Sequence, residues 1–248
     1  MPASVFKMCY TENMKNCLRK FKIFKNGFTL AEVLITLVIV GVVAALTIPV
    51  TVAKYHEQQT IQSLKNAYST FAQAIKMAEA NNGPVAAWDI GPGDTQEGSL
   101  KLYNLIVPHL SLAKECRENS GCFSNGYTTL QGTNVPYQPN TWGRYIRGIL
   151  NNGMPFLIWS SGSGCTGHYG DNFCGVIRVD INGDKKPNRY GYDFFSFRIT
   201  KNGLLPAGRE NNPTRCNHSG SDEENGADCT AWVLYKNNFD YKNKDISW

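Results

Sequence analysis

The most informative part of this chain is residues 25–52, with the sequence KNGFTLAEVLITLVIVGVVAALTIPVTV. From residue 33 to residue 53 the chain has 21 consecutive uncharged residues. A helix of about 20 such residues spans the hydrocarbon core of a bilayer, because its backbone polar groups are bonded within the helix. The sequence therefore predicts a membrane-spanning helix. A single carboxylate, Glu32, stands at its start, where a charge is costly and is commonly kept for a function.

The same stretch resembles the N-terminal signal of type IV pilins and type II secretion pseudopilins. Gly27 precedes the bond that is cut in that family, Phe28 becomes the new N-terminus, and Glu32 lies five residues in, counting Phe28 as the first. The resemblance covers residues 25–83 and implies cleavage by a prepilin peptidase, N-methylation of Phe28, and assembly with other pilin or pseudopilin subunits on an inner-membrane platform. The other residues that fit the family pattern are Thr29, Leu30, Ala31 and Pro49.

The charge of the leader predicts the orientation in the membrane. Residues 1–27 carry six Lys and Arg against Glu12, a net charge of +5 that equals the net charge of the whole chain. Basic residues beside a first membrane helix stay cytoplasmic. We therefore expect a single-pass protein of the bacterial inner membrane, with a cytoplasmic N-terminus and a periplasmic or extracellular head, which enters a filament after assembly.

Two other readings of the N-terminus are an uncleaved signal anchor and a conventional secretory signal. A conventional signal has an apolar core of 7–15 residues followed by a small-residue cleavage site. In this chain the core is longer, and Ala44 and Ala45 lie inside it. Cleavage before the core, between Gly27 and Phe28, would instead keep the apolar helix in the mature protein.

Glu32 has two interpretations. It is an interfacial carboxylate near the membrane surface, or, as the resemblance implies, it pairs with the Phe28 amino group of a neighbouring subunit. Opposite charges attract strongly in a low-dielectric layer, and an unpaired charge is penalised there. An N-methylated amine can still carry charge. We expect such a pair to set the register between subunits.

Beyond the membrane the helix is predicted to continue. Its apolar residues recur at alternating spacings of three and four, which places them on one helical face; they are Ile61, Leu64, Tyr68, Phe71, Ile75 and Ala78. Asn81-Asn82-Gly83-Pro84 then ends the helix. We expect this face to pack on the protein's own sheet.

Residues 84–248 predict a β-rich head. Short β-branched and aromatic runs separated by turn residues are typical of strands, and we expect them at residues 154–160, 173–181, 194–200 and 231–235. Residues 99–116 predict one amphipathic helix that Pro108 bends or divides. Hairpin loops are expected at Asn182-Gly183, at residues 201–203 and at residues 162–164.

The predicted fold class is α+β, with a long N-terminal helix on a small antiparallel sheet whose loops are held by disulfides. Four parts follow: a removed leader (1–27), a transmembrane and polymerisation helix (28–53), the outer half of the long helix (54–83) and the head (84–248).

The cysteines divide into two groups. Cys9 and Cys17 lie in the leader, and the head holds an even count on the side expected to be oxidising. Six cysteines allow 15 connectivities, and pairing of sequence neighbours gives three short loops. A metal site is the weaker interpretation, because no Cys-x-x-Cys pair occurs. The six cysteines are Cys116, Cys122, Cys165, Cys174, Cys216 and Cys229.

One acidic segment is a candidate calcium site. It offers hard oxygen ligands at alternate positions, namely Asp180, Asn182 and Asp184, with Asn188 and Asp193 downstream. Some major pseudopilins, which this segment resembles only at the level of the fold, bind calcium in a late β-loop. An EF-hand is excluded, because Lys185 and Gly191 occupy its glycine and closing glutamate positions. The alternative is an Asn-Gly turn whose side chains bond their own backbone, and we expect no cofactor unless calcium binds.

No catalytic constellation emerges. The chain has no Gly-x-Ser-x-Gly elbow and no phosphate-binding glycine loop, and its four histidines are scattered. A neutral mature chain also argues against broad nucleic-acid binding. The first hypothesis is therefore a non-enzymatic filament subunit of a pilus or pseudopilus. The second is a minor tip pilin that acts as an adhesin or ligand-binding module, and the third is a membrane-anchored exoenzyme.

Overall fold

The computed structural model describes residues 27–166, 172–183, 185–209 and 215–247. Apart from Gly27, the expected leader lies outside the described residues. The chain divides into two compact units, residues 1–52 and residues 53–248. Helix α2 (Leu30–Asn82) supplies residues to both units.

In the first unit, α2 is apolar and its side chains are exposed. Its large hydrophobic residues range from 44% exposed at Val33 to 80% at Leu30, and by length and composition α2 is able to cross a membrane. Thr47 and Thr51 donate their hydroxyls to helix carbonyls one turn earlier. A hydroxyl satisfied within the helix needs no water, so these residues suit a hydrocarbon environment.

In the second unit, one face of α2 is buried, which confirms the predicted apolar stripe. Tyr68 is half-buried beside this face and donates its hydroxyl to the Leu204 carbonyl at 3.2 Å. The helix ends at Asn82, and Gly83 adopts φ +79°, a conformation that favours glycine after a helix. The buried residues of α2 are Ile61, Leu64, Ala67, Phe71, Ala74, Ile75 and Ala78.

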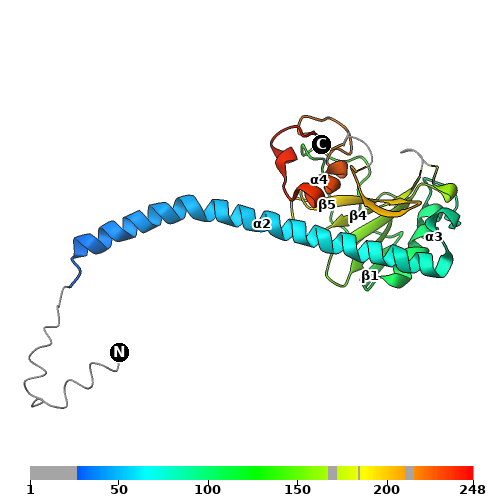
Figure 1. Ribbon diagram of the computed structural model, residues 1–248, viewed down its shortest axis with the longest axis horizontal. Helices are drawn as coiled ribbons and strands as arrows, with labels where there is room; N and C mark the ends of the chain where they lie inside the picture. Colours follow the sequence, from blue (N-terminus) through cyan, green and yellow to red (C-terminus); the bar gives the residue numbers. More distant parts are fainter. Residues whose placement is uncertain (1–26, 167–171, 184, 210–214, 248) are drawn as a thin grey trace, which may run out of the picture. The chain divides into compact units, whose positions relative to one another are not determined.

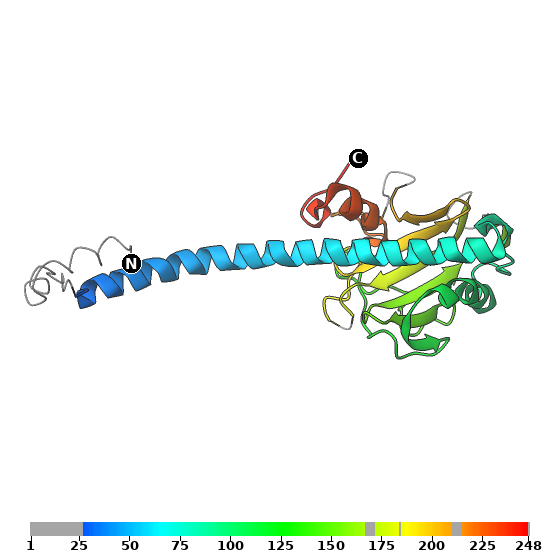
Figure 2. The same ribbon diagram turned by 60° about the horizontal axis from the view of Figure 1, so that its bottom comes forward.

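Within the described residues, six strands form one antiparallel sheet in sequence order. Each strand pairs with the next, so that Val179 lies between Phe156 and Phe195. Figures 1 and 2 show the second half of α2 along one side of this sheet. The fold is therefore α+β, as predicted. The strands are β1 (Leu112–Arg117), β2 (Ile146–Leu150), β3 (Pro155–Ser160), β4 (Phe173–Asp180), β5 (Phe194–Thr200) and β6 (Gly203–Pro206).

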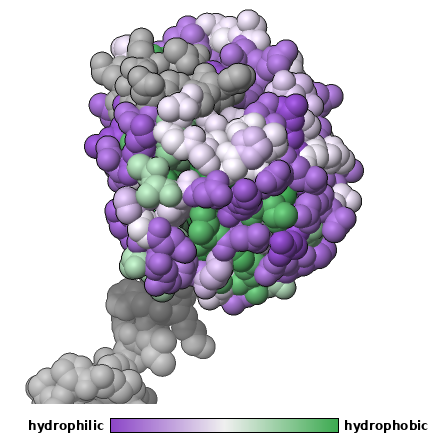
Figure 3. All heavy atoms as spheres, turned by 90° about the vertical axis from the view of Figure 1, so that its right-hand side faces the viewer, coloured by the Kyte–Doolittle hydropathy of each residue, from purple (hydrophilic) through white to green (hydrophobic). Residues whose placement is uncertain are grey.

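Both faces of the sheet are covered. Side chains on one face of the sheet, such as Phe156 and Ile177, form the larger core with α2 and α3 (Gln96–Ile106). Side chains on the opposite face, such as Leu157 and Val176, form a second core with residues 116–145. Strands β3 and β4 are therefore buried along their whole length, which accounts for their nearly continuous apolar sequences. The surface of the head seen in Figure 3 is mainly hydrophilic, with small hydrophobic patches.

The helix expected over residues 99–116 is present only in its first part: the chain is interrupted at Pro108, as expected, but no helix follows. Helix α3 ends at Ile106, Pro108 lies in a short 3₁₀ turn, and β1 begins at Leu112. Proline lacks the N–H that would continue the helix. At the other end, α3 starts earlier than expected because the Thr95 hydroxyl accepts the Gly98 N–H at 3.0 Å and caps the helix.

The expectation of a strand at residues 231–235 is wrong, since they lie in α4 (Thr230–Lys236) (Figure 1). A five-residue apolar run does not distinguish a strand from a helix. Tertiary contacts favour the helix: the Thr230 hydroxyl accepts the Ser196 N–H of β5 at 3.0 Å. Asn237 ends it with φ +54° and donates its N–H to the Val233 carbonyl.

Candidate functional site

The N-terminal site lies at the start of α2. Phe28 is 86% exposed, and within the described residues no atom beyond the chain neighbours of Gly27 lies within 4 Å of the position that a Cβ on Gly27 would take. The Thr29 hydroxyl accepts the Glu32 N–H at 3.2 Å. In return, Glu32 Oε2 accepts the N–H and the hydroxyl of Thr29, each at 2.8 Å. This reciprocal arrangement is a capping box at the first turn of the helix.

The capping box gives Glu32 a structural role that the sequence analysis missed. The signal was present, because Thr29 and Glu32 stand at the Thr-x-x-Glu spacing before an apolar run. The cap uses only Oε2 of the carboxylate. A partner could therefore bind at Oε1 without breaking the cap.

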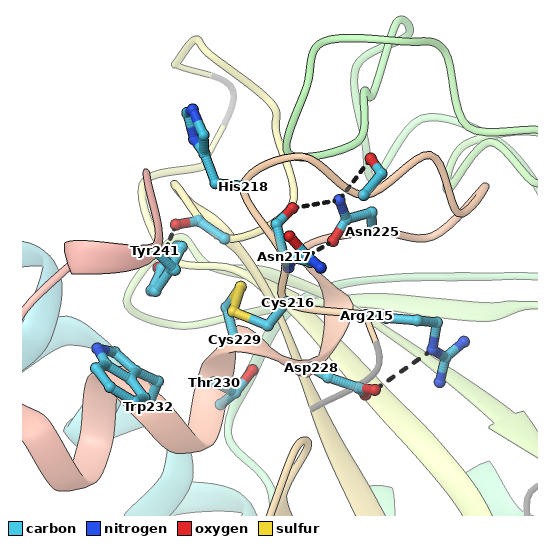
Figure 4. The surroundings of a disulfide bond; sticks show 12 residues. Arg215, Cys216, Asn217, His218, Asn225, Asp228, Cys229, Thr230, Trp232 and Tyr241 are labelled. Atoms are coloured by element: carbon cyan, nitrogen blue, oxygen red, sulfur yellow. Dashed lines mark hydrogen bonds and ion pairs between the residues drawn. A yellow bond between two sulfur atoms is a disulfide. The ribbon is translucent and has the colours of Figure 1, made fainter. Parts of the chain in front are cut away.

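The structure pairs the six head cysteines as sequence neighbours, as the three short loops suggested. Disulfides join Cys116 to Cys122, Cys165 to Cys174, and Cys216 to Cys229. Figure 4 shows the last of these together with the neighbouring ion pair between Arg215 and Asp228. Inside this loop, the Asn225 side chain accepts the Asn217 N–H and donates to the Asn217 carbonyl, so the loop is ordered by polar contacts as well as by the bond.

The described part of the candidate calcium segment is engaged in hydrogen bonds within the chain. Asp180 accepts from the Tyr127 hydroxyl at 2.5 Å and from the Asn182 N–H at 3.1 Å. Asp193 accepts the Asn188 and Arg189 N–H groups at 2.8 and 2.6 Å, and burial raises its pKa. Gly183 has φ +75°.

Of these contacts, the one from the Asn182 N–H to Asp180 is the local side-chain bond expected of a turn. No group of three His, Cys, Asp or Glu side chains able to hold a metal occurs among the described residues. Asp184 lies outside them, and calcium binding stays a prediction.

A cavity of about 180 Å³ lies on the sheet face opposite α2. Its floor is formed by β3, β4 and β5 through Trp159, Val176, Arg178, Ser196 and Arg198. Most of its walls come from two other parts of the chain, the segment before β2 and residues 215–228 at the Cys216–Cys229 disulfide, and Asp94 and Ala207 complete the lining. The principal wall residues are Tyr137, Trp142, Arg144, Tyr145, Arg215, Glu224 and Asp228.

Alternating charges run along one side of this cavity. Glu224 accepts from Arg178 and from Arg215, each at 2.5 Å, and Asp228 accepts from Arg198 at 2.8 Å and faces Arg215 at 3.5 Å. Burial alone would raise the pKa of Glu224, but the guanidinium groups of Arg178 and Arg215 outweigh burial and hold that pKa below its usual value. Glu224 is therefore a carboxylate at neutral pH.

Aromatic rings form the other side. Trp142 is half-buried, and its ring centroid lies 4.5 Å from that of Tyr137 and 4.5 Å from that of Tyr145. The Arg144 guanidinium lies 5.3 Å from the Trp142 ring centroid and pairs with Asp94 at the rim. The cavity thus combines ring faces with fixed hydrogen-bonding groups, which is the general composition of ligand sites.

The histidines that the structure describes are not brought together. His56 lies on α2, His109 in the turn after α3, and His218 in the loop of the Cys216–Cys229 disulfide. His168 lies outside the described residues.

Residues 24–48 match the family described as the prokaryotic N-terminal methylation motif. This is the prepilin-type motif of type IV pilins and pseudopilins, so the protein carries the N-terminal signature of that class of structural subunit. The chain matches no curated protein and no solved structure.

Proposed function

We propose that this protein is a subunit of a type II secretion pseudopilus or a type IV pilus. A prepilin peptidase removes residues 1–27, Phe28 is N-methylated, and residues 28–53 hold the protein in the inner membrane with the head outside the cytoplasm. The subunit then joins others at the assembly platform. The observation that carries this proposal is the methylation motif on a helix that is exposed and apolar over its first half. The buried second half of the helix belongs to the head.

Glu32 acts in assembly as the partner of a neighbouring subunit's Phe28 amine. The capping box supports this role, because it fixes the carboxylate at the first turn and occupies only Oε2. The cationic amine of an incoming subunit approaches Oε1. In a layer of low dielectric constant such a pair is favourable, whereas a lone charge is strongly penalised.

Three substitutions separate the charge of Glu32 from its capping role. Glu32→Gln removes the charge and keeps a residue that completes a capping box, Thr29→Ala removes the capping hydroxyl and keeps the charge, and Glu32→Ala removes both. We expect both Glu32 variants to enter filaments at least about tenfold less, because one subunit's amine is left unpaired. Thr29→Ala should assemble nearly as the unmodified protein does.

The measurement is the ratio of subunit in sheared filaments to subunit in the membrane, by immunoblot. N-terminal sequencing of the membrane pool should begin at Phe28 in every variant, which shows that processing is intact. Assembly of Glu32→Gln at the unmodified level would contradict charge pairing. A loss in Thr29→Ala as large as that in Glu32→Gln would assign the effect to the cap.

A second candidate function is ligand binding by the head of a minor subunit. It is favoured by the cavity, which lies between an aromatic wall (Tyr137, Trp142 and Tyr145) and a charged wall (Arg215, Glu224 and Asp228).

A further inference from the structure

The geometry points to a binding site for one acidic sugar residue, of the uronic acid class, in the cavity opposite α2. The proposal concerns the head alone and does not depend on how the protein assembles. It rests on the size of the cavity, its surplus of hydrogen-bond donors, its carboxylate acceptors and its aromatic wall.

The size fits a single ring. A volume of about 180 Å³ is below the roughly 300–1,000 Å³ of sites that enclose drug-sized ligands. It also exceeds the share of a few water molecules, at about 30 Å³ each in the liquid. The cavity therefore accommodates one sugar unit.

The floor offers more donors than the protein itself uses. Arg198 has five N–H donors, and the hydrogen bond found for it within the described residues goes to Asp228. Arg178 is 8% exposed and its Nε has no partner in the described structure. The hydroxyl of Ser196, a residue 3% exposed, is likewise without a partner. A buried polar group left unsatisfied is costly, so a ligand rich in acceptors is favoured here.

The charges favour one negative group on that ligand. Among the described residues that line the cavity, four arginines stand against three carboxylates. Guanidinium groups bind carboxylates bidentately, and Arg198 lies on the floor with most of its N–H groups available. The carboxylate of a uronic acid fits this position.

The remaining features distinguish a sugar from other acids. Glu224 and Asp228 are acceptors in the lining and call for ligand donors, which sugar hydroxyls supply and a simple aromatic acid lacks. Trp142 and Tyr137 line the cavity with aromatic rings, and the C–H face of a pyranose packs on such rings as an apolar surface. A carboxylated, hydroxylated ring satisfies all three demands.

The test uses the full chain in a zwitterionic detergent without a sugar headgroup. Methyl β-D-glucuronide, methyl β-D-glucoside and benzoate are titrated separately, and binding is followed by calorimetry. The glucuronide should bind saturably, and the other two at least about tenfold more weakly, the equivalent of one charge-assisted hydrogen bond. Absence of saturable glucuronide binding, or equal affinity for the glucoside or benzoate, would overturn the proposal.

Variants locate the site. Trp142→Ala should weaken glucuronide binding about tenfold, whereas Tyr235→Ala, at an exposed ring that does not line the cavity, should leave it unchanged. Arg198→Gln should remove the preference for glucuronide over glucoside, and Arg198→Lys should retain most of it. Thermal melting checks that each variant is folded. Unchanged preference in folded Arg198→Gln would place the anion elsewhere and refute the assignment.

Discussion

At the scale of single residues, Arg147 holds the aromatic wall of the cavity in place. It lies on β2, is fully buried, and donates to the backbone carbonyls of Glu118, Pro139, Trp142 and Tyr145. Burial lowers its pKa, yet a guanidinium stays charged at neutral pH. One side chain thus satisfies carbonyls of a long segment without regular structure, which otherwise would have to remain near water.

We expect Arg147→Lys to destabilise the protein by about 2–4 kcal/mol, because an ammonium on a thinner stem cannot reach four carbonyls in the fork geometry of arginine. Chemical denaturation of the full chain in detergent measures the change. The control is Arg117→Lys on the partner strand β1, whose side chain is 42% exposed, and it should change the free energy of unfolding little. Equal effects of the two substitutions would show that the forked guanidinium of Arg147 is not needed for stability.

At the scale of elements, success in prediction depended on whether the local pattern was unambiguous. The stripe of α2 extends over many turns, and β4 and β5 are dense in β-branched and aromatic residues, so both kinds of element were predicted correctly. Strand β2 was missed because Gly148 interrupts it. A Cβ on Gly148 would lie 2.8 Å from the Phe156 ring, so the glycine makes room for a core side chain that sequence alone does not place.

The disulfide loops allow a prediction that compares elements of different length. Removing the Cys216–Cys229 bond by substituting both cysteines with Ala should cost about 3 kcal/mol. The Cys116–Cys122 bond closes a loop about half as long, with sequence separations of 6 and 13, so its removal should cost about 0.6 kcal/mol less. Denaturation midpoints of the two double variants measure the difference. If removal of the bond in the shorter loop cost more stability, native contacts rather than the entropy of loop closure would determine which disulfide contributes more.

At the scale of the whole molecule, a site formed by consecutive residues can be predicted from sequence, whereas a site built from distant segments of the chain cannot. Gly27, Phe28 and Glu32 lie within six consecutive residues, so their pattern was readable from the sequence. The cavity draws its lining from strands, from the segment before β2 and from the last disulfide loop, positions from Asp94 to Asp228. Only the meander and the disulfides bring these segments together, and no local pattern encodes that outcome.

The charged wall of the cavity joins the sheet to the last disulfide loop, so it should make the stability of the protein depend on pH. The folded state holds the pKa of Glu224 below its usual value, which is roughly 4.3 in an unfolded chain. Between these two values the unfolded state binds more protons, so stability is present above about pH 4.3 and is lost as pH falls through the folded pKa.

Melting of the full chain and of Glu224→Gln from neutral to acidic pH tests this dependence. At neutral pH the variant should be less stable by roughly 3 kcal/mol, because Arg178 loses its charged partner in a buried position. As the carboxylate of the unmodified protein becomes protonated, this difference should shrink. Glu223→Gln, at an exposed neighbour, should follow the unmodified curve throughout. A difference between Glu224→Gln and the unmodified protein that is constant with pH would mean that the Glu224 charge does not join the loop to the sheet.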